Sequence, residues 1–518
     1  MKKTALVAAA AILMIAACGK KEGEGAEPAK ESAAAPSTEE QAAPAGDKIV
    51  RPPSDPYPST YRPYPSGATL IKGATVLTGA GERIDNGAVL IVEGKVAAVG
   101  PASSVKAPEG ASVIDAHGKW VTPGIIDIHS HLGVYPSPQT DSTSDGNEAV
   151  SPNTAQVWAE HSVWPQDPGF TRALAGGVTS LQALPGSANL FGGRSVVLKN
   201  VPARTVEGMK FPGAPYGLKM ACGENPKRVY GDKGGPSTRM ANFAGYRAAW
   251  IEAAAYKKKW EDYWKDAEKF YAEEDKADGK NADKKKKGGG KEDEDKKPPE
   301  PPTRDLKLET LAGVLNGDVI VNMHCYRGDE MAHVIDMAKE FGYKLASFHH
   351  AVEAYKVADI LAANGICAAM WADWWGFKLE AYDSVRENIA LVDAQENSCA
   401  IVHSDSQYGI QRLNQEAGKA MSDGVRIGLK IPEERAIRWI TSNPAKAIGV
   451  LDKTGTLEAG KMADVVIWNG NPFSVYALAE KVFIDGALMY DRDDEKRSPR
   501  SDFEIGQPTN GFTGGAGQ

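Results

Sequence analysis

The chain has 518 residues, a length typical of about three domains, although one α/β barrel can absorb about 250 residues. Its composition, 42% hydrophobic and 25% charged, is ordinary for a globular protein. The net charge of -8 argues against a nucleic-acid-binding protein, since no part of the chain is strongly basic.

The first residues have the pattern of an export signal. Two lysines follow the initial methionine, and residues 4–17 form an apolar run that is too short to span a bilayer. The letters IAACG at residues 15–19 resemble a bacterial lipobox, with Ile where Leu is commonest. The resemblance implies a lipoprotein signal peptide over residues 1–18 and lipidation of Cys18. The alternative is an ordinary signal peptide with an incidental cysteine.

A lipid on Cys18 would anchor the protein to a membrane in the cell envelope, with its domains facing the periplasm. Gly19 is not the aspartate that often retains lipoproteins in the inner membrane, so in a Gram-negative cell it favours the outer membrane. Residues 19–67 are polar and rich in Ala, Glu and Pro. Such a composition buries too little apolar surface to fold and predicts a flexible tether.

Two β-rich stretches flank the long middle of the chain. Residues 68–120 are short runs rich in Val, Ile and Gly with regular turn signals, and the pattern returns over residues 455–492. Together they predict one small β-sandwich domain formed from both ends of the chain. Residues 493–518 are predicted to be a flexible tail.

The middle section, residues 121–454, alternates apolar strand-like runs with segments of helical spacing. This alternation favours a parallel α/β architecture. One part departs from it, because residues 236–275 form a long polar and aromatic helix candidate. Residues 275–302 are so rich in charge that they predict a disordered, solvated insertion.

Four cysteines outside the lipobox lie singly in apolar segments: Cys222, Cys325, Cys367 and Cys399. No CxxC pair occurs among them. The sequence therefore predicts small, buried, unpaired residues rather than a disulfide framework.

Two histidines end the first apolar run of the middle section. Because side chains alternate along a strand, His129 and His131 point to the same side at its carboxyl end. Two histidines so placed can chelate one divalent ion at about 2.0–2.1 Å. Alone the pattern is a weak signal, since structural histidines are common.

Three further runs end in side chains that bind metals. His324 ends one run, His349 and His350 end the next, and Asp405 ends a fourth. In a ring of parallel strands all the carboxyl ends meet at one face, where the active sites of such barrels form. The strand ends therefore predict one common metal site.

These motifs, in their order, resemble the amidohydrolase superfamily of metal-dependent hydrolases. The matching stretches are TPGIIDIHSH, HCYR, FHH, HSD, TSNPAKAIG and GTLEAGKMADVVIW. The likeness is greatest to the branch of imidazolonepropionases and prolidase-type dipeptidases, and it covers residues 68–492 apart from the charged insertion. It implies a (β/α)8 TIM-type barrel over residues 121–454, together with the small β-sandwich already predicted.

The family pattern assigns metal ligands residue by residue. His129 and His131 would hold the more buried ion, and His324 matches the ligand after the fifth strand. In the histidine doublet, His350 fits the family's sequence context better, and His349 is the alternative.

The same resemblance assigns a catalytic residue and a bridging ligand. Asp405 matches the aspartate after the eighth strand, which in the family ligates metal and shuttles a proton. Many relatives carry a lysine on the fourth strand that CO2 carboxylates so that it bridges two ions. Lys219 is assigned this role. If it is unmodified, the site holds a single ion or Glu224 forms the bridge.

Imidazole and carboxylate ligands suit Zn2+ or a similar divalent ion. Such an ion lowers the pKa of bound water from 15.7 towards about 7 and polarises a substrate carbonyl. The ligand set therefore predicts hydrolysis at neutral pH.

Candidates for substrate binding follow the ligands in sequence. Tyr326 and Arg327 would lie in the same mouth, where Arg327 could pair with a substrate carboxylate or instead join a surface salt bridge. His403 shares a face with Asp405 and is a candidate outer-sphere partner of the metal site. Residues 370–378, MWADWWGFK, could form an aromatic wall or serve only in packing.

The sequence as a whole predicts an amidohydrolase that cleaves a C–N bond of a small substrate, such as a dipeptide or an N-acyl amino acid. Hydrolysis of a cyclic amide, a lactone or another ester is the alternative, since hydroxide attacks any activated carbonyl. A non-catalytic metal- or peptide-binding lipoprotein would be expected to lack part of the ligand set, and here the set is complete.

Overall fold

The computed structural model describes residues 48–284 and 297–494. The predicted lipobox with Cys18, the first part of the predicted tether and most of the predicted tail lie outside these residues. Within them, no helix is both long and apolar enough to cross a membrane.

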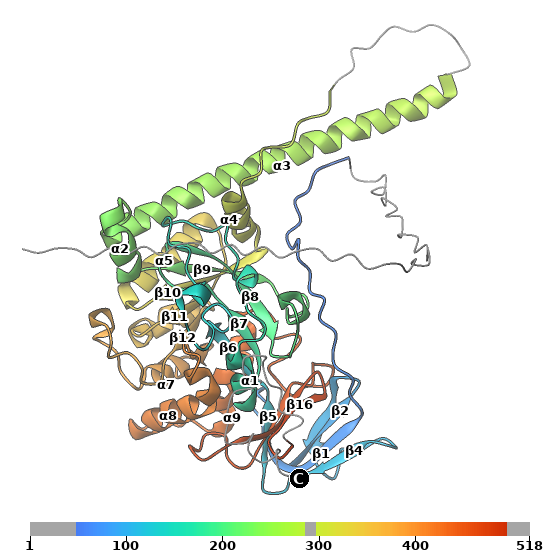
Figure 1. The fold of residues 1–518 in the computed structure, drawn as a ribbon, viewed down its shortest axis with the longest axis vertical. Helices are drawn as coiled ribbons and strands as arrows, with labels where there is room; N and C mark the ends of the chain where they lie inside the picture. The colour runs from blue at the N-terminus through green and yellow to red at the C-terminus, as the bar shows by residue number, and fades with distance from the viewer. Residues whose placement is uncertain (1–47, 285–296, 495–518) are drawn as a thin grey trace, which may run out of the picture. The chain divides into compact units, whose positions relative to one another are not determined.

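An eight-stranded sheet forms the barrel, and this confirms the predicted TIM-type fold (Figure 1). In sheet order its strands are β6 (Ile125–Ser130), β7 (Val178–Ala183), β8 (Phe191–Lys199), β9 (Tyr216–Ala221), β10 (Val319–Cys325), β11 (Leu345–His350), β12 (Cys367–Met370) and β13 (Ala400–Val402). Every residue of these strands is buried. Burial on both faces explains why they read as nearly continuous apolar runs.

One strand departs from the predicted all-parallel pattern. Strand β8 runs antiparallel to both β7 and β9, whereas the other neighbouring pairs are parallel. An antiparallel pair needs only a short connection, while a parallel pair needs a crossover of a dozen or more residues. The short segment 184–190 therefore joins β7 to β8 without a helix.

Helices cover the outside of the barrel. They are α1 (Pro168–Ala175), α2 (Glu224–Tyr230), α4 (Leu306–Asn316), α5 (Gly328–Phe341), α6 (Ala358–Ala363), α7 (Asn388–Asp393), α8 (Leu413–Arg426), α9 (Glu433–Ala436) and α10 (Ser442–Ala447). The helices α5, α7 and α8 lie beside the later strands of the barrel (Figure 1). Their buried sides complete the main hydrophobic core.

The second sheet combines both ends of the folded region, as predicted. Its strands are β1 (Thr69–Leu77), β2 (Arg83–Val92), β3 (Lys95–Pro101), β4 (Ser112–Asp115), β5 (Trp120–Pro123), β14 (Val465–Trp468), β15 (Ala479–Ile484) and β16 (Ala487–Asp491). The antiparallel pair β5–β14 joins the two halves, with Val121 opposite Ile467. The eight strands form one hydrogen-bonded sheet, and β5 extends across the boundary predicted at residue 121.

A buried ion-pair network fastens this sheet to the barrel. Lys199, at the end of β8, places Nζ 3.0 Å from both carboxylate oxygens of Asp464 and 3.1 Å from Oδ2 of Asp485. The Lys199 side chain is fully buried, and both carboxylates are nearly so. Thr454 and Tyr61 donate hydrogen bonds to the same two carboxylates, at 2.7 Å and 2.6 Å.

The prediction of a tether through residue 67 is wrong for residues 48–67. Tyr61 is 5% exposed, and Ser59 Oγ donates to the carbonyl of Lys210 at 2.6 Å. Nearer the start of this segment, the carbonyl of Val50 accepts a hydrogen bond from Trp264 Nε1 at 3.0 Å. The segment has no helix or strand period, so its sequence gave no sign of these long-range contacts.

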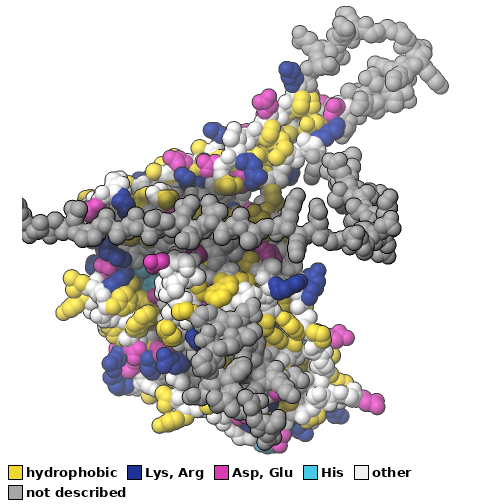
Figure 2. All heavy atoms as spheres, in the orientation of Figure 1, with side chains coloured by type: hydrophobic (Ala, Val, Ile, Leu, Met, Phe, Trp, Pro, Cys, Tyr) yellow, Lys and Arg dark blue, Asp and Glu magenta, His cyan; other side chains and the backbone are white. Residues whose placement is uncertain are grey.

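The long helix candidate is confirmed and longer than predicted. Helix α3 runs over Arg239–Lys284, so the predicted disordered insertion is wrong for residues 275–284, and residues 285–296 lie outside the described part. A buried stripe with spacings of three and four follows the helix: Tyr246, Trp250, Ala253, Tyr256, Trp260, Tyr263 and Ala267. Part of it packs on α4. Charged side chains of both signs also line α3 (Figure 2).

The prediction of unpaired cysteines is wrong. Disulfides join Cys222 to Cys325 and Cys367 to Cys399, with Cα–Cα distances of 5.2 Å and 4.5 Å. Each pair links adjacent strands or strand ends of the barrel, although 103 and 32 residues separate the partners in sequence. Single cysteines in separate apolar runs become neighbours only through the strand order.

Lys199→Met tests the network between barrel and sheet. We expect it to lower the free energy of unfolding by about 3–5 kcal/mol, because it leaves two buried carboxylates without their cation. Chemical denaturation measures the change. Lys258→Met, at an exposed pair on α3, is the control and should change stability little. An equally small effect of Lys199→Met would contradict a structural role for the network.

Candidate metal centre

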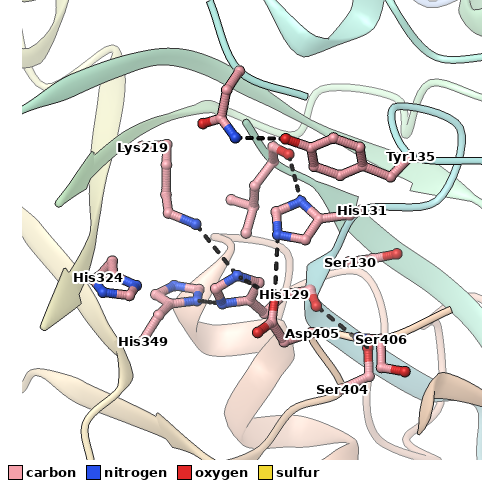
Figure 3. Close-up of polar contacts among 12 residues, drawn as sticks. His129, Ser130, His131, Tyr135, Lys219, His324, His349, Ser404, Asp405 and Ser406 are labelled. Atoms are coloured by element: carbon pink, nitrogen blue, oxygen red, sulfur yellow. Dashed lines mark hydrogen bonds and ion pairs between the residues drawn. The ribbon is translucent and has the colours of Figure 1, made fainter. Parts of the chain in front are cut away.

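The first strand delivers two histidines to the carboxyl end of the barrel, where Asp405 meets them (Figure 3). Asp405 Oδ1 lies 3.2 Å from His131 Nε2 and 3.4 Å from His129 Nε2. His131 Nδ1 contacts the carbonyl of Leu184 at 2.9 Å. A carbonyl only accepts, so Nδ1 carries the proton and Nε2 keeps its lone pair towards Asp405. A lone pair facing a carboxylate is an arrangement that a shared cation stabilises.

Lys219 reaches the same point from β9. Its Nζ lies 3.3 Å from His129 Nε2, and its side chain is completely buried. Burial lowers the pKa of Lys219 from 10.5 to about 7. A large share of the amine is therefore uncharged at neutral pH.

Three more histidines extend the cluster around His129. Its ring centroid lies 4.6 Å from that of His350 and 4.9 Å from that of His403, and His350 lies 4.5 Å from His324. Two groups have ligand atoms mutually within 4.8 Å: His129, His350 and His403 in one, and His129, His131 and Asp405 in the other.

Several imidazole nitrogens of this cluster are buried without a hydrogen-bond partner. They are Nδ1 of His324, Nδ1 of His350 and both ring nitrogens of His403. Buried polar atoms are nearly always paired in folded proteins, so several orphans at one place need an explanation. A bound cation satisfies them, and the donor set therefore fits a metal ion.

The histidine doublet divides into two environments. Both ring nitrogens of His349 are engaged, Nε2 with Ser347 Oγ at 2.8 Å and Nδ1 with His129 Nδ1 at 2.8 Å. His350 has Nδ1 without a partner. The geometry thus favours His350 as a ligand and His349 as a support for His129.

Burial keeps these imidazoles uncharged. Desolvation lowers the pKa of His129, His324 and His350 well below 6.5, with neighbouring cationic groups adding to the effect. The pKa of His403 falls to about 3, again chiefly through burial. At neutral pH each ring offers a lone pair, which is the form that binds a metal.

A buried carboxylate that the sequence analysis missed supports the centre. Asp127 Oδ1 accepts the backbone N–H of His129 at 3.1 Å, and its other oxygen accepts from Ser404 Oγ. The N–H of Asp405 donates to the carbonyl of His129 at 3.0 Å, so β6 and the end of β13 are linked here. The signal was present, because Asp127 shares the strand face of His129 and His131.

Backbone conformation is unusual at two ligands. His350, Ala351 and Asp405 have φ values of 69°, 38° and 53°. Residues other than glycine seldom adopt such values, and they persist where the surroundings fix them. His324 on β10 and His349 on β11 are paired across the two strands. His350 is the last residue of β11, so its side chain need not follow the alternation of side chains along the strand.

The predicted substrate-binding residues separate in the structure. Tyr326 is buried with its ring 4.8 Å from that of His324. Arg327 instead lies outside the histidine cluster and pairs with Asp329 at 3.0 Å, its side chain 42% exposed. This is the surface salt bridge that was the alternative prediction for Arg327. Glu224 begins α2, where its Oε1 lies 3.7 Å from Lys378 Nζ.

Comparisons with known proteins agree with the fold. Residues 120–494 match the model of the amidohydrolase family. The chain is 30% identical to amidohydrolase tasK of Hapsidospora irregularis over 422 residues, which are 79% of this chain but only 39% of that protein. An imidazolonepropionase of Rhizobium rhizogenes is 22% identical over 75% of this chain and 88% of its own. The crystal structure of an amidohydrolase from Thermotoga maritima MSB8 superposes with a TM-score of 0.64 and 34% identity, covering 82% of this chain and 100% of its own.

Measurement of zinc binding tests which histidine of the doublet, His349 or His350, is a metal ligand. Losing an outer-sphere partner typically weakens metal binding about 10- to 100-fold. We expect His349→Ala to weaken zinc binding within that range and His350→Ala to weaken it by more. Competition with a chromogenic chelator gives the Kd. His117→Ala, at a 70% exposed side chain, is the control. The reverse order of the two effects would make His349 the ligand.

Proposed function

The chain belongs to the amidohydrolase family, and on that premise we propose that it is a metal-dependent hydrolase that cleaves the C–N bond of a small amide. A dipeptide or an N-acyl amino acid is the proposed substrate. The observation that carries the proposal is the convergence of His129, His131 and Asp405 with ligand atoms within 4.8 Å of one another.

Zn2+ is the proposed ion, because neutral imidazoles and a carboxylate are ligands that it prefers. The residues that would hold it, or a pair of ions, are His129, His131, Lys219, His324, His350 and Asp405. When bound, such an ion makes water a nucleophile at neutral pH and polarises the substrate carbonyl. The position of His403 beside His129 and His350 makes it a further candidate ligand.

Carboxylation of Lys219 is part of the proposal. A carbamate forms from the uncharged amine, and burial already lowers the pKa of Lys219 to about 7. Its Nζ is 3.3 Å from His129 Nε2, which leaves it close to the proposed ion. The added carboxylate would supply oxygen ligands to the ion.

Asp405 would move the proton. Its carboxylate is 21% exposed, whereas the side chain of His129 beside it is fully buried, so solvent reaches Asp405. It would accept a proton from the attacking water and return it to the leaving nitrogen, as a general base and then a general acid. The backbone bond from its N–H to the carbonyl of His129 holds it in place.

A cyclic amide is the second candidate substrate. The likeness to the Rhizobium rhizogenes imidazolonepropionase, which extends over most of both chains, favours it. Both candidates use the same ligands and the same proton transfer, and they differ in what binds the rest of the substrate.

We also propose that the protein is exported and anchored by a lipid on Cys18. The two buried disulfides support export, since disulfides persist mainly in oxidising compartments. The full chain should therefore fractionate with membranes, and Cys18→Ser should release it or leave it unprocessed. Labelling with a palmitate analogue checks this directly. Equal labelling of both proteins would contradict the anchor.

Asp405→Asn tests the enzymatic proposal. Zinc-loaded protein is assayed on dipeptides, N-acyl amino acids and cyclic amides by release of amine. We expect the variant to lose about 100- to 10,000-fold in kcat, because general acid–base catalysis contributes about that much. Zinc content and thermal stability are measured alongside, and Asp262→Asn on the exposed side of α3 is the control. Absence of C–N hydrolysis by the fully loaded parent would overturn the proposed function.

A further inference from the structure

A loop with a lysine and several aromatic rings lies beside the histidine cluster. It follows β12 and runs from Trp371 to Lys378. The Trp371 ring lies 4.2 Å from the ring of His350 and 5.3 Å from that of His403. This loop is therefore in direct contact with the residues proposed to hold the metal.

Lys378 ends the loop and turns towards the same cluster. Its Nζ lies 2.7 Å from Asn225 Oδ1, and Asn225 Nδ2 lies 3.4 Å from His324 Nε2. The ammonium group also sits 5.0 Å above the centre of the Tyr326 ring. The amide side chain of Asn225 thus separates this cation from a proposed metal ligand. The Lys378 side chain is only 17% exposed.

Among the described residues, Lys378 forms a single, long ion pair, with Glu224. Its nearest acidic oxygen, on Glu224, is 3.7 Å away, and its 2.7 Å partner is a neutral amide. In contrast, Lys199 has two carboxylates within 3.1 Å and Arg327 has one at 3.0 Å. A largely buried ammonium group is costly unless it is well paired. A substrate carboxylate would complete its coordination.

The aromatic rings beside Lys378 offer an apolar surface. Trp374 and Phe377 are 47% and 54% exposed, and their rings lie 5.4 Å and 5.7 Å from that of Trp371. Trp371 itself is buried, and its Nε1 has no hydrogen-bond partner. Exposed aromatic side chains grouped at the rim of a site are typical of binding surfaces. The unpaired indole N–H is a second donor available to an acceptor on a ligand.

We propose that Lys378 binds the free carboxylate of the substrate, and that Trp374 and Phe377 contact a large apolar side chain next to it. The inference rests on the proposed function and narrows it to N-acyl or peptidyl derivatives of apolar amino acids with a free carboxylate. Lys378 thereby takes the carboxylate-binding role for which Arg327 was a candidate. Amides without a free carboxylate lack the group that this lysine recognises.

The test compares Lys378→Met and Lys378→Arg with the parent as full chains loaded with zinc. The substrates are N-acetyl-L-phenylalanine and its carboxamide, which differ only in the negative charge. We expect Lys378→Met to raise KM for the acid about 10- to 100-fold, the effect of one charge-assisted hydrogen bond, and to leave KM for the carboxamide and both kcat values nearly unchanged. Lys378→Arg should restore much of the affinity for the acid. Lys258→Met is the control for charge alone.

Binding of 3-phenylpropanoate and 3-phenylpropanamide, measured by calorimetry, gives a readout that needs no turnover. Loss of affinity for the propanoate alone in Lys378→Met supports the inference, whether or not the parent hydrolyses either amide. Absence of hydrolysis by the parent would overturn only the proposed function. Equal losses for acid and carboxamide would overturn the inference and leave the function standing. So would a selective loss for the acid in Arg327→Met but not in Lys378→Met. Equal zinc content and melting temperature show that each variant is folded.

Discussion

The burial of uncharged imidazoles at the carboxyl ends of the barrel strands is the constraint on which the site depends. In a low-dielectric interior, several imidazolium charges side by side would be prohibitively costly, so the rings stay neutral and present lone pairs. His324, His350 and His403 keep ring nitrogens that the protein itself does not satisfy. The fold is thus prepared for positive charge that arrives with a ligand. The positive φ angles of His350 and Asp405 belong to the same arrangement, because they turn two side chains into it.

The outer parts of the chain hold this site rigid. The sheet made from both chain ends is fastened to the barrel through Lys199, whose partners Asp464 and Asp485 come from the second half of the sheet. The Cys222–Cys325 disulfide ties together the ends of β9 and β10, which carry Lys219 and His324. Elements distant in sequence therefore fix the spacing between the residues that are proposed to meet one ion.

The loop after β12 makes the site asymmetric. On the side of β6 the histidines meet Asp405 and the supporting carboxylate of Asp127. On the opposite side they meet the Trp371 ring and, through Asn225, the ammonium group of Lys378. In the proposed function, metal binding and substrate recognition therefore use separate residues: the strand ends would carry the first, and this loop would carry the second.

The sequence by itself determined the α/β middle section, the two-ended sheet and the strand ends that carry the histidines and Asp405, because strand periodicity and strand ends are local properties that the letters record. The barrel itself was predicted from the resemblance to a known family. It did not determine the cysteine pairs, the docking of residues 48–67, the antiparallel course of β8 or the isolation of Arg327 in a surface pair. Each of these depends on which strands and loops become neighbours. Lys378 shows the difference most clearly. Its neighbours Asn225 and Tyr326 are 153 and 52 positions away in the chain, and only the order of the strands in the barrel brings the three together.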